Sequence, residues 1–162
     1  MNLSSRCLCG SGIAYQDCCA PFHLGEKYPT TAQALMRSRY TAYALRNVAY
    51  LQATWDVTKR PEHIDFSREN IEWLRLEIIE CKKGGMKDAK GIVVFKAYYQ
   101  QDGEEHCMNE ISRFTKHQGL WFYLDGVIKS IGKVGINTNQ GLNALCACGS
   151  GKKFKRCCAT KA

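Results

Sequence analysis

The chain has 162 residues, of which 45% are hydrophobic, 23 are basic and 15 are acidic, and its formal net charge is +8. This length and apolar share are enough for one ordinary domain with a single buried core and small appendages. No stretch has the length and hydropathy of a transmembrane span or a secretory signal, so we expect a cytoplasmic protein in a reducing compartment.

The chain opens with a cysteine pattern at residues 7–19, which reads C-L-C-G-S-G-I-A-Y-Q-D-C-C. The pattern returns at residues 146–158 as C-A-C-G-S-G-K-K-F-K-R-C-C, with seven identical positions. Four cysteines in one short loop match the soft ligands of a tetrahedral structural zinc site, so the sequence predicts two zinc ions per chain. The predicted ligands are Cys7, Cys9, Cys18 and Cys19 in the first copy and Cys146, Cys148, Cys157 and Cys158 in the second.

Two other uses of these thiols stay open, namely disulfide pairing and a redox or metal-transfer site. A reducing cytoplasm disfavours disulfides, and adjacent cysteines such as Cys18 and Cys19 bridge each other only with strain. The glycines of the Gly-Ser-Gly turn can adopt positive φ, which lets backbone N–H groups face the sulfur atoms. We expect Tyr15 and Phe154 to cover the metal and His23 to be a surface or linker residue outside the ligand set.

Helical periodicity follows the first cysteine pattern. Apolar side chains recur at helical spacing over residues 32–51, which predicts a helix with Thr30 as its N-cap that ends near Asn47, followed by a short second helix. Arg37 and Arg39 of the first helix are interpreted as part of a solvated face, although an Arg-Ser-Arg sequence could also hold an anion.

The apolar period changes to two after the helices. The alternation predicts four strands, around residues 74–78, 92–99, 106–114 and 121–124, with glycine-containing turns between them. Strands separated by such short connections pair as hairpins. The sequence therefore predicts an α+β fold in which an antiparallel meander is covered by the N-terminal helices.

The two cysteine copies differ in charge. Residues 144–162 contain five basic residues and no acidic one, whereas residues 1–24 contain one of each. The basic positions Lys152, Lys153, Lys155 and Arg156 correspond to Ile13, Ala14, Gln16 and Asp17 in the first copy. We therefore predict a basic docking face on the C-terminal module and a structural role for the N-terminal module.

The cysteine patterns resemble the SEC-C motif, which binds zinc at the C-terminus of the bacterial preprotein translocase ATPase. The second copy matches the motif at nearly every position, and the first copy keeps its cysteines and its Gly-Ser-Gly turn. The resemblance implies zinc binding and contact with partner proteins or ribosomes.

The whole chain resembles the YchJ family of SEC-C proteins. The likeness includes A-L-M-R-S-R-Y-T-A-Y-A at residues 34–44, E-I-S-R-F at residues 110–114 and W-F-Y-L-D-G at residues 121–126. It implies a cystatin-like middle domain of the nuclear-transport-factor type, in which a curved antiparallel sheet wraps the N-terminal helices as a cone. The expected organisation is a zinc module at 1–24, the middle domain at 25–140 and a second zinc module at 141–162.

Two functions are consistent with this organisation. The preferred one is a zinc-binding, non-enzymatic interaction protein whose basic C-terminal module docks on a protein or a ribosomal partner. The alternative is a small-molecule-binding protein or an enzyme of the ketosteroid-isomerase type, with Arg75, Glu110 and Ser112 in a pocket of the middle domain. Pairing of two chains through the open sheet is a further expectation, because relatives of this superfold often dimerise in that way.

Overall fold

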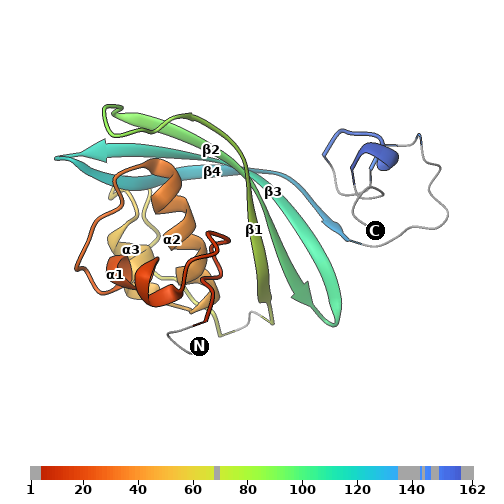
Figure 1. The fold of residues 1–162 in the computed structure, drawn as a ribbon, viewed down its shortest axis with the longest axis horizontal. Helices are drawn as coiled ribbons and strands as arrows, with labels where there is room; N and C mark the ends of the chain where they lie inside the picture. The colour runs from red at the N-terminus through yellow and green to blue at the C-terminus, as the bar shows by residue number, and fades with distance from the viewer. Residues whose placement is uncertain (1–4, 68–69, 135–142, 144, 147–149, 158–162) are drawn as a thin grey trace.

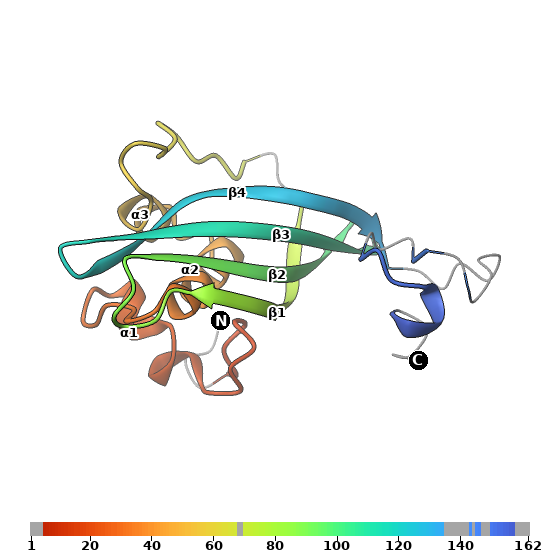
Figure 2. The same cartoon turned by 90° about the horizontal axis from the view of Figure 1, so that it is seen from above.

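The computed structural model of the protein describes residues 5–67, 70–134, 143, 145–146 and 150–157. Over these residues the chain has an α+β fold, in which a four-stranded antiparallel sheet curves around the N-terminal helices (Figure 1). Figure 2, seen from above, shows the helices gathered along one face of the sheet. The structure confirms the predicted fold class.

The sheet is a meander of long strands in the order β1-β2-β3-β4, namely β1 (Glu72–Lys83), β2 (Lys90–Gln101), β3 (Glu104–His117) and β4 (Leu120–Lys133). Tight turns at Asp102-Gly103 and Gln118-Gly119 join the last three strands, and these turn residues all have positive φ. Such turns twist in the same sense as the strands, so pairing continues to the strand ends. The strands are therefore longer than the apolar alternation alone predicted.

Three helices precede the sheet: α1 (Ala20–His23), α2 (Ala32–Ala44) and α3 (Val48–Ala53). The N-cap of α2 is Thr31, whose hydroxyl accepts a backbone N–H at 3.1 Å, so the prediction of Thr30 is wrong by one residue. Helix α2 ends at Ala44 because Asn47 caps α3 instead of continuing α2. Within the described ranges, no helix has both the length and the hydropathy needed to cross a lipid bilayer.

The start of α2 is fixed directly to the sheet. The backbone N–H of Ala32 donates to the carbonyl oxygen of Gly84 at 2.9 Å. The indole N–H of Trp121 donates to the carbonyl oxygen of Thr30 at 3.1 Å. Gly91 on β2 permits this approach, because a Cβ atom there would lie only 2.6 Å from the Cα of Gly84. The helix therefore sits in one defined position over the concave face of the sheet.

The main core lies between α2 and the sheet, and it includes Leu35, Met36, Tyr40, Leu76, Val93, Phe95, Phe114 and Trp121. Strand β1 has bulges after Trp73 and after Ile78, where the side-chain alternation shifts by one residue. Trp73 and Leu76 both pack toward the core for this reason, although they are an odd number of positions apart. Arg75, which precedes Leu76, lies on the outer face of the sheet.

Candidate metal centres and an internal cavity

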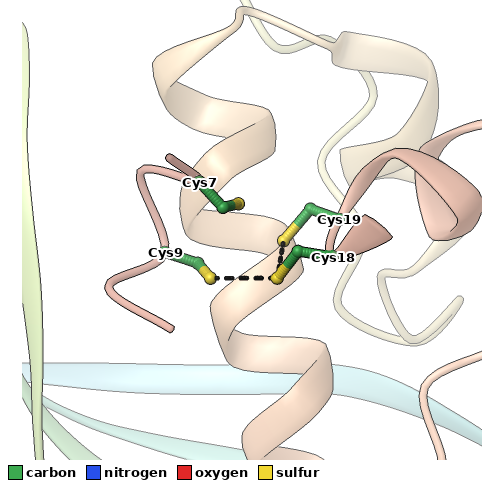
Figure 3. A group of neighbouring side chains, drawn as sticks. All are labelled: Cys7, Cys9, Cys18 and Cys19. Carbon is green, nitrogen blue, oxygen red and sulfur yellow. Dashed lines mark hydrogen bonds between the residues drawn. The ribbon is translucent and has the colours of Figure 1, made fainter. Parts of the chain in front are cut away.

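The sulfur atoms of Cys7, Cys9, Cys18 and Cys19 converge on one point (Figure 3). They all lie within 4.8 Å of one another, with 3.5 Å between those of Cys9 and Cys18 and 3.9 Å between those of Cys18 and Cys19. Four sulfurs bound tetrahedrally at about 2.3 Å from a zinc ion lie about 3.8 Å apart. The donor set and its spacing therefore fit a tetrahedral metal site, and this cluster could hold a divalent cation.

A tight turn and a short 3-10 helix bring these cysteines together. The N–H of Cys7 donates to the carbonyl oxygen of Ile13 at 2.8 Å, which closes the Gly-Ser-Gly turn. Gly12 in this turn has a φ of 79°, a conformation that residues with a side chain rarely adopt. The 3-10 helix at Tyr15–Asp17 then reverses the chain, so that the second cysteine pair faces the first.

Hydrogen bonding and burial set the charge of these thiols. Hydrogen bonds from the neighbouring thiols of Cys19 and Cys7 lower the pKa of Cys9. Burial raises the pKa of Cys18 to about 11, and hydrogen bonding to Cys7 raises the pKa of Cys19. Without a cation the arrangement thus favours a thiolate at Cys9 and protonated thiols at Cys18 and Cys19. A bound divalent cation would stabilise all of them as thiolates.

The N-terminal cysteine module is packed onto α2. A guanidinium nitrogen of Arg37 donates to the carbonyl oxygen of Cys9, and the hydroxyl of Thr41 lies 3.6 Å from the sulfur of Cys7. Cys7, Cys9 and Cys19 are at most 4% exposed. The module and the helix are therefore one packed unit rather than two independent parts.

His23 strengthens this attachment. Its Nε2 lies 2.9 Å from the carbonyl oxygen of Ser38, which can only accept, so Nε2 carries the proton. Its Nδ1 then accepts from the hydroxyl of Tyr15 at 2.9 Å, and the ring packs against Tyr50. Burial lowers the pKa of His23 and keeps the ring neutral. His23 lies outside the cysteine cluster, but its interpretation as a surface or linker residue is wrong.

The C-terminal cysteine copy repeats these local contacts. The N–H of Cys146 donates to the carbonyl oxygen of Lys152 at 2.8 Å, as Cys7 does at the equivalent position. Ser150 lies 3.0 Å from the sulfur of Cys157, and Ser11 of the first copy lies 3.1 Å from its cysteine counterpart. A 3-10 helix follows in both copies. The described residues of the two copies thus share the same local contacts.

The basic residues of the C-terminal copy are available at its surface. Lys152, Lys153, Lys155 and Arg156 are exposed, and none of the ion pairs between described residues involves them. Two predicted ligands of this copy, Cys148 and Cys158, lie outside the described residues. The ligand roles of all eight cysteines therefore stay predictions.

A separate cavity of about 190 Å³ lies in the middle domain, between α2 and the sheet. Its walls are mainly apolar and include Met36, Tyr40, Trp73, Phe95, Ala97 and Met108. Arg39, Glu110, Ser112 and Tyr123 supply its polar lining, and the hydroxyl of Ser112 donates to Glu110 at 2.6 Å. The cone is thus not completely filled by its own side chains.

Of the three residues predicted for a pocket, Glu110 and Ser112 line this cavity and Arg75 does not. The guanidinium of Arg75 pairs with Glu105 at 2.7 Å and lies 3.7 Å from the ring centroid of Tyr98. Leu76, the next residue of β1, packs in the core, so strand alternation places Arg75 on the outer face of the sheet and its assignment to a pocket is wrong.

The arginine of the cavity is Arg39, which the sequence interpretation placed on a solvated helix face. Its side chain is 2% exposed and donates to the carbonyl oxygen of Leu51 and the hydroxyl of Thr54, both at 2.7 Å. Residues two positions apart on a helix point about 200° apart. Arg37 and Arg39 therefore cannot both face solvent. Their spacing of two residues is the signal in the sequence that one of them is buried.

Comparison with protein families gives two matches. The family described as "YchJ, middle NTF2-like domain" matches residues 31–126, and the SEC-C motif matches residues 4–21 and 143–160. A UPF0225 protein of Serratia proteamaculans is 41% identical over 158 residues, which cover 94% of this chain and 96% of that protein. UPF0225 protein VP1145 of Vibrio parahaemolyticus is 36% identical over 170 residues, with 96% and 99% coverage.

Solved structures show the same likeness. The solution structure of a SEC-C motif containing protein from Rhodopseudomonas palustris has a TM-score of 0.67 and 33% identity, and covers 76% of this chain and 98% of that one. The crystal structure of a SEC-C motif containing protein from Psychrobacter arcticus has a TM-score of 0.65 and 27% identity, with full coverage of both chains. The chain therefore belongs to the YchJ family of UPF0225 proteins, with a SEC-C motif on each side of a nuclear-transport-factor-like middle domain.

Proposed function

We propose that this protein is a zinc-binding, non-enzymatic interaction protein that holds two zinc ions per chain and docks on its partner through the C-terminal module. The observation that carries the proposal is a contrast between two modules of the same local geometry. The N-terminal module packs against α2, whereas the C-terminal module displays exposed basic side chains.

Zinc is the metal that best suits the cysteine clusters. Four thiolates form a soft, tetrahedral donor set, and zinc occupies such sites in structural modules without redox chemistry. The ligands would be Cys7, Cys9, Cys18 and Cys19 in one module and Cys146, Cys148, Cys157 and Cys158 in the other. A module this small buries little apolar surface, so the metal would supply much of its folding free energy. A reducing compartment such as the bacterial cytoplasm would keep these thiols available.

The partner that fits the C-terminal module is an acidic protein surface. Lys152, Lys153, Lys155 and Arg156 lie within five consecutive positions and are all exposed, so they add to one local positive field. A ribosomal partner is less well supported, because single-stranded nucleic acid is commonly held by aromatic rings that stack on bases. The C-terminal cysteine pattern contains one aromatic residue, Phe154.

Charge reversal tests the docking face. In the variant Lys152→Glu/Lys153→Glu/Lys155→Glu/Arg156→Glu, we expect capture of partner proteins from a bacterial extract to be lost while native mass spectrometry still finds two zinc ions. A matched control, Lys59→Glu/Arg60→Glu/Lys87→Glu/Lys129→Glu, changes the net charge by the same amount at exposed positions of the middle domain.

The two variants separate a local docking face from a general effect of charge. The proposal requires that the control retains capture and that the captured proteins carry acidic surfaces. It is refuted if the C-terminal variant captures the same proteins as the wild type, or if both variants lose them equally. Co-sedimentation of the wild type with ribosomal subunits, abolished in the same variant, would replace the protein partner by a ribosomal one.

A further inference from the structure

The cavity of the middle domain contains a buried cation without a paired anion. Arg39 is 2% exposed, and among the described residues no carboxylate forms an ion pair with it. Its guanidinium carbon lies 4.9 Å from the ring centroid of Trp55 and 4.6 Å from that of Tyr123, so aromatic faces partly stabilise the charge. A buried guanidinium is nonetheless costly unless its hydrogen bonds are completed.

The hydrogen bonds of Arg39 are only partly made by the protein. Both of its bonds, to the carbonyl oxygen of Leu51 and the hydroxyl of Thr54, use Nη1. A guanidinium has five N–H donors, so the edge formed by Nε and Nη2 donates to none of the described residues. This edge is the one that a carboxylate occupies through two parallel hydrogen bonds.

The other lining residues set the polarity of the ligand. The hydroxyl of Tyr40 is buried and has no hydrogen-bond partner among the described residues. One carboxylate oxygen of Glu110 already accepts from Ser112 at 2.6 Å and from Tyr123 at 3.5 Å. The remaining walls are largely aromatic or aliphatic. The cavity therefore combines an arginine that has unused donors with an apolar body.

The volume of the cavity limits the size of the ligand. An apolar cavity of about 150 Å³ holds a benzene molecule. The 190 Å³ here accommodates one ring with a carboxyl group.

We propose that this cavity binds a compact apolar monocarboxylate of about the size of benzoate. The carboxylate pairs with the Nε–Nη2 edge of Arg39, and the ring lies among the side chains of Trp73, Phe95 and Met108. This inference goes beyond the docking function and does not depend on it, because the cavity and the basic module share no residue.

The test is an NMR titration of the zinc-loaded full chain with benzoate, with benzamide as the neutral analogue of the same shape. We expect saturable shifts of the indole N–H of Trp73 with a dissociation constant on the order of 1 mM or tighter for benzoate. Benzamide should bind at least about tenfold more weakly, because it cannot form the charge-assisted pair. Absence of saturable benzoate binding, or equal binding of benzamide, would overturn the proposal.

Three variants locate the site. Arg39→Lys keeps the charge but loses the planar fork, and we expect benzoate binding to weaken by about tenfold or more. Ala97→Leu adds side-chain volume to the wall of the cavity and leaves the Arg39 side chain unsubstituted, so binding should disappear while a dispersed NMR spectrum shows that the fold persists. Glu110→Gln removes a negative charge near the carboxylate and should tighten benzoate binding. Unchanged binding in a folded Ala97→Leu chain, or weaker binding in Glu110→Gln, would contradict the assignment.

Discussion

Replacing Cys9 by serine should remove one zinc ion and also destabilise the middle domain, because the N-terminal module is packed on α2. Loss of its metal would break three contacts between the module and α2. Two are hydrogen bonds, from Arg37 to the carbonyl oxygen of Cys9 and from His23 to the carbonyl oxygen of Ser38. The third is the contact between the sulfur of Cys7 and the hydroxyl of Thr41. A bond from a charged donor contributes about 1.5–3 kcal/mol and a neutral one about 0.5–1.5 kcal/mol.

The expected loss in the free energy of unfolding is therefore about 2.5–6 kcal/mol, which corresponds to a decrease in Tm on the order of 10 °C for a chain of this size. Urea unfolding followed by tryptophan fluorescence reports on the middle domain, because Trp73 and Trp121 pack in its core. Native mass spectrometry on the same samples gives the zinc content.

The equivalent substitution in the other module, Cys148→Ser, is the matched control. We expect it also to reduce the zinc content from two ions to one while leaving the unfolding midpoint of the middle domain nearly unchanged. Equal destabilisation by both substitutions, or no destabilisation by Cys9→Ser despite the loss of zinc, would refute the idea that the N-terminal module supports α2.

Three further predictions follow from the same geometry. Zinc binding should release protons from Cys18 and Cys19, because the pKa values of these thiols are raised. Calorimetric heats of metal binding will therefore depend on the ionisation enthalpy of the buffer, and zinc will be lost as the pH falls. Because burial lowers the pKa of His23, the unfolded state takes up a proton at a higher pH than the folded state does. The free energy of unfolding should therefore fall as the pH decreases below about 6.5. Urea denaturation at several pH values should show a weaker pH dependence of this free energy in the variant His23→Gln. Gly91→Ala should lower the unfolding midpoint strongly, because the added Cβ would lie 2.6 Å from the Cα of Gly84. Gly85→Ala should have little effect on the midpoint, because the nearest atom to its Cβ would be a carboxylate oxygen of Asp88 at 3.5 Å.

Local patterns in the sequence were sufficient for much of this architecture. The turn residues at Asp102-Gly103 and Gln118-Gly119 fix hairpins between neighbouring strands, so the meander could be predicted without knowledge of distant contacts. The N-terminal cysteine cluster is also local, because all four sulfurs come from one short segment. The expected pairing of two chains through the sheet stays a prediction.

Features that depend on distant contacts or on irregular backbone could not be predicted in this way. The bulge after Trp73 brings that side chain to the same face of the sheet as Leu76, and simple alternation contains no signal for it. The burial of Arg39 depends on α3 and β4, which supply its acceptors and one of its aromatic neighbours. The contact between Arg37 and Cys9 likewise joins segments that only the tertiary fold brings together.

The most direct test of the zinc-site account is the metal content of the purified chain, measured by native mass spectrometry under reducing conditions before and after treatment with a strong chelator. We expect a mass increase of two zinc ions per chain, loss of both ions on chelation, and simultaneous loss of ordered NMR signals from both cysteine modules. A metal-free chain whose two modules give the same dispersed signals before and after chelation would contradict it.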